Sequence, residues 1–113
     1  MRLLLLLTLL LTGCSKGPQS DLPYISQARS LAAEWALING LAANGRLTHV
    51  YIATMHKQLR EQLQTAASSL TQPDSRYGEE IHALLSQPDD APPGELRVHA
   101  DQLKQIEDAL ESA

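Results

Sequence analysis

The chain has 113 residues, enough for one small domain, and carries 9 Lys and Arg against 13 Asp and Glu, a formal net charge of −4. The basic residues are scattered singly. This argues against nucleic acid as a partner and against an electrostatic grip on anionic lipid, because both need clustered Lys and Arg. With no Phe, one Trp and a single Cys, the core must come mainly from Leu, Ile and Ala, without an internal disulfide.

The N-terminus has the pattern of an export signal. Met1-Arg2 is followed by Leu3–Leu11, of which all but Thr8 are Leu. As a helix this run would be about 14 Å long, so it cannot span a hydrocarbon core of about 30 Å. It fits the apolar centre of a signal peptide instead, and we assign residues 1–13 to a segment that is removed from the mature protein.

Leu11-Thr12-Gly13-Cys14 resembles the lipobox of bacterial lipoproteins, in which an aliphatic residue and two small ones precede a Cys. The resemblance implies that the Cys14 thiol takes a diacylglycerol, that the signal peptidase cuts between Gly13 and Cys14, and that the new amine is acylated, for example with palmitate. Two acyl chains anchor a protein stably where one does not. The alternative is an ordinary secretory signal with an incidental cysteine.

The residues after Cys14 suggest where the protein is held. Ser15 resembles the residue that permits transfer to the outer membrane, which implies an anchor on the periplasmic face of that membrane. Residues 14–22 are polar and turn-forming and are expected to be a flexible tether. The seven residues from Ser15 to Asp21 reach at most about 25 Å when extended. We therefore expect the folded domain, residues 23–113, and whatever it binds to lie close to the membrane.

The rest of the chain has apolar residues at the 3-4 spacing typical of helices. The first helix opens near Pro23, with Asp21 as a candidate cap, and ends at Asn44-Gly45, although Asn39-Gly40 is an earlier candidate stop. Thr48 is expected to cap the second helix, which ends before Gln72-Pro73.

A shorter helix is expected over residues 75–86 and a last one over residues 95–112, with a Pro-rich loop over residues 87–94. These segments predict an all-α fold, a small antiparallel bundle of three long helices and one short helix. The expected core is Tyr24, Ala28, Leu31, Trp35, Ile38, Ala42, Ile52, His56, Leu59, Leu63, Ala66, Leu70, Tyr77, Ile81, Leu84, Leu85, Leu96, His99, Leu103, Ile106 and Leu110, with Leu41, Tyr51 and Met55 widening the apolar faces.

Four histidines raise the question of a metal site. Glu79 and His82 have the Glu-x-x-His spacing of di-iron bundles, but such a site needs a second pair, for which Glu95 and His99 are the nearest match, and inward-facing carboxylates. A solvated Glu79–His82 pair is the favoured interpretation, so no metal is predicted. The roles of His56, His82 and His99 stay open, including a pH-sensitive one.

The chain shows no motif for catalysis. It lacks a Gly-x-Ser-x-Gly elbow and a phosphate-binding glycine loop, and Asp89-Asp90 fits a solvated turn better than an acid-base pair. We therefore expect no enzyme, no small-molecule substrate and no cofactor beyond the lipid on Cys14.

Two charged surfaces are expected on the helices. Gln58, Arg60, Glu61, Gln62 and Gln64 form a polar face typical of solvent exposure. Glu107, Asp108 and Glu111 crowd the last turns of the final helix, where the helix dipole disfavours negative charge. Either the end of that helix frays, or a basic partner docks there.

The favoured function is a lipid-anchored module that binds a protein partner or assists assembly at the cell envelope. In length, lipobox and helix content the chain resembles the secretin pilotins, small lipoproteins that take a partner's helix into a groove, although helical pilotins commonly have a disulfide that is missing here. One alternative is a structural lipoprotein that self-associates, as the murein lipoprotein does. A metal-binding helical bundle is a more remote alternative.

Overall fold

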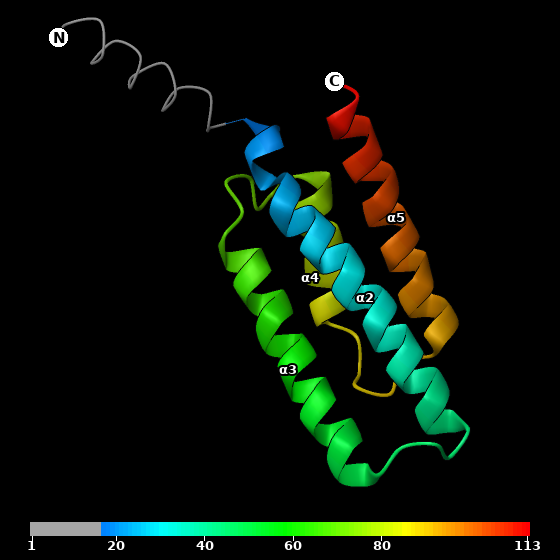
Figure 1. Cartoon of the computed structure of the whole chain (residues 1–113). Coiled ribbons are helices and arrows are strands. Elements are labelled where there is room, and N and C mark those ends of the chain that lie inside the picture. Colours follow the sequence, from blue (N-terminus) through cyan, green and yellow to red (C-terminus); the bar gives the residue numbers. More distant parts are fainter. Residues whose placement is uncertain (1–16) are drawn as a thin grey trace, which may run out of the picture.

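The computed structural model describes residues 17–113, and all of their regular structure is helical. A short 3-10 helix, η1 (Pro18–Asp21), leads into four α-helices: α2 (Leu22–Ala43), α3 (His49–Ser68), α4 (Arg76–Leu85) and α5 (Pro93–Glu111) (Figure 1). The predicted all-α class is therefore confirmed. The segments predicted to be a signal peptide and a lipobox, including Gly13 and Cys14, lie outside the described residues. Within residues 17–113 no helix is both long and apolar enough to cross a bilayer.

The helix ends follow most of the predicted signals. Thr48 and Ser75 cap α3 and α4, because their side chains accept hydrogen bonds from the Tyr51 and Gly78 amides at 3.2 Å each. Helix α2 ends just before Gly45, whose positive φ of 68° is the left-handed conformation that glycine tolerates. The earlier candidate stop does not act: α2 runs unbroken through residues 39–40.

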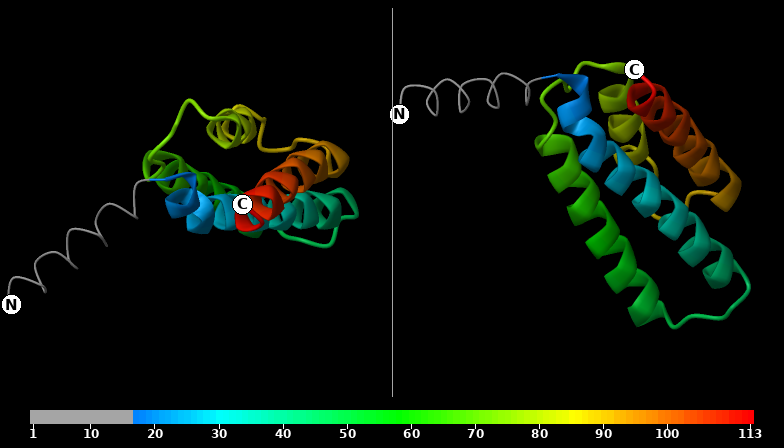
Figure 2. Two further views of the ribbon diagram at one scale, coloured as in Figure 1. Left: turned by 90° about the horizontal axis from the view of Figure 1, so that it is seen from above. Right: turned by 45° about the horizontal axis from the view of Figure 1, so that its top comes forward.

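Helix α2 lies at the centre of the bundle. It packs along α5 on one side and α3 on the other, whereas no Cα atoms of α3 and α5 lie within 8 Å of each other. Figure 2 shows α4 across from α2, between α3 and α5. Because α2 has neighbours on two sides, it buries Ile25, Ala32 and Ala36 in addition to the predicted stripe that contains Trp35.

Asp21 fastens the end of the bundle where the chain enters. The expectation that its side chain caps α2 is wrong, since the fully buried carboxylate turns to the α3–α4 connection. It accepts hydrogen bonds from the Tyr77 hydroxyl at 2.6 Å, from the Thr71 amide and hydroxyl, and from the Gln72 amide. Burial alone would raise the pKa of Asp21, but these hydrogen bonds together outweigh it and hold the pKa below its usual value. Burial and the bond to Asp21 raise the pKa of Tyr77.

One of the three acids in the last turns of α5 has a cationic partner within the domain. Glu107 is buried and pairs with Arg29 of α2, whose Nε lies 2.7 Å from Glu107 Oε1. Asp108 and Glu111 are exposed, and Asp108 has Lys104 as a weak neighbour at 3.4 Å. The intramolecular cation therefore compensates the most buried of the three acids.

Candidate functional site

Helix α4 is too short to accompany α3 along its whole length. Its 10 residues extend about 15 Å, whereas the 20 residues of α3 extend about 30 Å. Tyr77 bonds to Asp21 near the end of α3, and Arg60, midway along α3, bonds to Leu85 at the end of α4. Helix α4 therefore covers only the second half of α3, and the first half, with the end of α2, continues past it (Figure 1).

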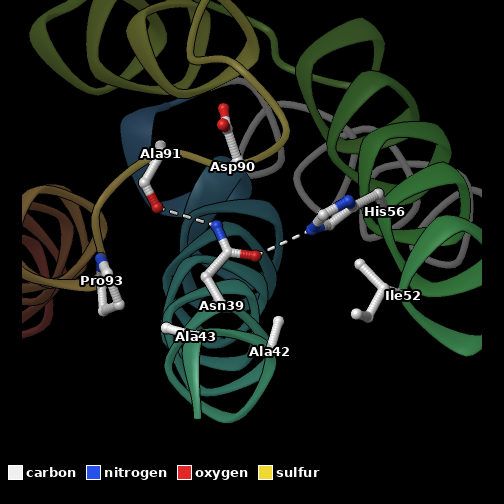
Figure 3. A pocket seen from close by; sticks show the side chains of 8 residues that line it. All are labelled: Asn39, Ala42, Ala43, Ile52, His56, Asp90, Ala91 and Pro93. Carbon is white, nitrogen blue, oxygen red and sulfur yellow. Dashed lines mark hydrogen bonds between the residues drawn. The ribbon is translucent and has the colours of Figure 1, made fainter. Parts of the chain in front are cut away.

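An apolar pocket of about 290 Å³ lies where α4 stops. Helix α2 forms its floor, α3 one side, the α4–α5 loop the upper rim, and the start of α5 the other side (Figure 3). The Asp90 carboxylate points away from the Asn39–His56 pair in this view, so the polar contribution to the pocket is small. The lining residues are Asn39, Ala42, Ala43, Ile52, His56, Asp90, Ala91 and Pro93.

Asn39, on the α2 floor of the pocket, makes hydrogen bonds to both of the neighbouring segments. Its Nδ2 donates hydrogen bonds to the Asp89 carbonyl at 2.9 Å and to the Ala91 carbonyl at 2.8 Å, which fixes the orientation of the amide. Its Oδ1 must then accept from His56 Nε2 at 2.8 Å, so Nε2 of His56 carries a proton. Asn39 thus ties the α4–α5 loop to α2 and α3 at once.

Arg60 and Trp35 also bind the α4–α5 loop, through Asp89 and neighbouring backbone carbonyls. Trp35 Nε1 donates to the Asp89 carbonyl at 2.9 Å, and Arg60 Nε lies 2.5 Å from Asp89 Oδ1. The Arg60 guanidinium also donates to the carbonyls of Leu85, at 2.9 Å, and Gln87, and it lies 5.0 Å from the centre of the Trp35 ring. The prediction that the polar face of α3 is solvent-exposed is therefore wrong for Arg60.

The histidine pairs expected from the sequence do not form a metal site. Glu79 and His82 are both exposed, and His82 Nδ1 bonds to a backbone carbonyl of its own helix. His99 pairs with Glu80 of α4, at 2.5 Å, instead of with Glu95 of its own helix. No group of three metal-binding side chains comes together within residues 17–113. The favoured solvated Glu79–His82 pair is consistent with this exposure.

The pocket is suited to holding apolar groups. Its polar groups are joined by hydrogen bonds, because Asn39 bonds both to His56 and to the Ala91 carbonyl. An engineered apolar cavity of about 150 Å³ holds a benzene molecule, so this volume can take one large side chain or two smaller ones. The pocket volume of about 290 Å³ is close to the smallest volume of pockets that bind drug-sized ligands, about 300 Å³.

Sequence reasoning placed Ala42, Ile52 and His56 on apolar stripes but did not bring them together as a pocket. The usable signals were an amide, Asn39, within an apolar stretch and a third helix much shorter than its neighbours. Among known proteins, no family model, no curated protein and no solved structure matches this chain significantly.

Proposed function

We propose that this chain is a bacterial lipoprotein anchored through Cys14 on the periplasmic face of the outer membrane, and that its helical domain binds a protein partner as an assembly module. The domain behind this function is an antiparallel bundle of three long helices and one short one. The observation that supports the binding role is the open apolar pocket beyond the end of α4. An apolar concavity with few polar groups is the usual form of a recognition site for an apolar side chain.

The proposed anchor and the pocket lie at opposite ends of the domain, which orients the pocket relative to the membrane. Helix η1, which leads into α2, lies at the end of the bundle where the α3–α4 connection and the C-terminus lie (Figure 1). The pocket residue Asn39 is 17 residues further along α2 than Leu22, which is about 25 Å of helix. With lipid on Cys14, only three residues before Gly17, the pocket would face away from the membrane. The tether length alone had suggested a partner close to the lipid surface.

The anchor is tested by the mass of the mature N-terminus after expression of the full chain in a bacterium with two membranes. We expect a first residue Cys14 that carries a diacylglycerol and an N-acyl chain. Cys14→Ser should leave the protein uncut or release it from membranes, and Ser15→Asp should retain the lipidated protein at the inner membrane. An unmodified Cys14 thiol in a membrane-free protein would refute the anchor.

The binding role is tested by a photo-crosslinking residue at Ala43, an exposed residue of the pocket lining, in the membrane-bound protein. Ala33, exposed on the same helix more than two turns earlier, is the matched control position. We expect one protein adduct that forms at Ala43 and not at Ala33. Equal adducts at both positions, or none, would contradict a partner site at the pocket, and an adduct of the chain with itself would favour the self-associating alternative.

A further inference from the structure

We propose that the pocket receives an acidic amphipathic helix of the partner, which lies beyond the end of α4 and places one large apolar side chain between α2 and α3. This rests on the proposed function, because it names the partner class for the same pocket. It adds a shape, a charge and an anchoring side chain to the partner.

The helical shape follows from the vacancy in the bundle. In the half of the domain that contains the α3–α4 connection, α4 occupies the space across from α2, between α3 and α5 (Figure 2). Below the α4–α5 loop no helix of residues 17–113 occupies that space, while α2 continues to Ala43 and α3 begins at His49. Side chains of two adjacent helices form a groove whose width fits a third helix, so a helical segment is the element that completes this packing.

The apolar requirement follows from what the vacancy leaves uncovered. Ala42, Ala43 and Ile52 line the pocket with small or aliphatic surfaces. Val50 and Tyr51, in the first turn of α3 at the same end of the molecule, are 78% and 46% exposed. They are two of only four large apolar side chains that are strongly exposed within residues 17–113. Together with the apolar pocket, these two side chains give this end of the domain the apolar character of an interaction site.

The acidic requirement follows from the distribution of charge. From Trp35 to Arg60 the chain has no Asp or Glu, although the whole sequence contains 13. Arg60 is neutralised by Asp89, whereas Arg46 and Lys57 are exposed at the pocket end of the hairpin. The one acidic residue of the pocket lining is Asp90, and its carboxylate points away from the Asn39–His56 pair (Figure 3). The hairpin that borders the pocket is therefore cationic in an otherwise acidic protein, and a partner with Glu or Asp beside its apolar residues is complementary to it.

The test uses the mature lipidated protein in neutral phosphatidylcholine vesicles, with Trp35, the only tryptophan, as the fluorescent probe. The Trp35 ring lies 6.4 Å from the ring of the pocket residue His56. Three synthetic peptides without Trp or Tyr are titrated: a Leu- and Glu-rich amphipathic helix, the same peptide with Lys for Glu, and the acidic peptide with a central Pro. We expect saturable binding of the acidic helix, at least tenfold weaker binding of the Lys form, and no binding of the Pro form.

Two variants with matched controls place the peptide. Ala42→Phe should fill the pocket and weaken binding of the acidic peptide at least tenfold, whereas Ala33→Phe should not. Lys57→Glu should weaken it by about three- to fivefold, the size expected for one exposed ion pair, and Arg97→Glu, with the same change in net charge, should have little effect.

Several results would overturn the proposal. These are equal or tighter binding of the Lys peptide, equal loss with Ala33→Phe and Ala42→Phe, or no binding of any helix. A response of Trp35 to anionic vesicles that Lys57→Glu abolishes would assign the surface to a membrane instead. If Ala43 still crosslinks one protein while these peptide results fail, the binding role stands and only the partner chemistry is wrong.

Discussion

Replacing Asn39 with alanine removes the side chain that ties the α4–α5 loop to both α2 and α3. The change deletes hydrogen bonds to the Asp89 and Ala91 carbonyls and from His56 Nε2. The Asp89 carbonyl keeps its bond from Trp35, so two groups, the Ala91 carbonyl and the His56 N–H, lose their protein partner. An unpaired buried polar group costs about 1–3 kcal/mol. Water entering from the open pocket can offset part of this cost, so we expect a loss of about 2–3 kcal/mol.

The measurement is urea unfolding of a soluble form that begins at Ser15, followed by far-UV circular dichroism and by Trp35 fluorescence. With a urea dependence of about 1.5 kcal/mol per M, the midpoint should fall by roughly 1.3–2 M. Gln58→Ala, which removes an exposed amide from α3, is the control and should change the free energy of unfolding by less than about 0.5 kcal/mol. A loss below about 0.5 kcal/mol for Asn39→Ala would refute the argument that Asn39 holds the loop.

A double-mutant cycle separates the contact from its neighbours. Asn39→Ala, His56→Ala and the double variant should show a coupling energy of about 1 kcal/mol, because each single change removes the same hydrogen bond. Strict additivity would mean that the two side chains act independently of one another.

Two other positions give predictions that depend on different physics. Because hydrogen bonds hold the pKa of Asp21 below 3.8, the unfolded chain takes up its proton first as the pH falls. The stability contributed by Asp21 is therefore complete above about pH 4 and is lost below it. Asp21→Asn should lower the free energy of unfolding at pH 7 by about 2 kcal/mol, and it should reduce the difference in that free energy between pH 7 and pH 3. Asp101→Asn, at an exposed site, is the control and should change neither quantity. An unchanged pH dependence in Asp21→Asn would count against the Asp21 cluster. Gly78→Ala places a methyl group 2.1 Å from the Pro73 carbonyl oxygen and should cost about 1–3 kcal/mol in urea unfolding, despite the better helix propensity of alanine. Gly94→Ala, which meets nothing within 4 Å, should instead stabilise by up to about 1 kcal/mol, and equal effects at both positions would contradict the packing argument.

The sequence by itself determined the helical class and most of the helix ends. The 3-4 spacing of apolar residues, the hydroxyls of Thr48 and Ser75, and the glycine at position 45 are local signals, because each acts within a turn or two of its own position. The proposed anchor at Cys14 is also a local signal, since a processing enzyme recognises a short segment of chain.

Only the tertiary structure decided which polar side chains bond to distant parts of the chain. Asp21 could have capped its own helix, Arg60 could have stayed in solvent, and His99 could have paired with Glu95. Each instead meets a partner that is distant in the sequence, because packing α4 against α3 and α5 brings the loop and the helices together. The pocket has the same origin: it exists because α4 ends halfway along α3, and no property of residues 39–56 alone shows where a separate helix will stop.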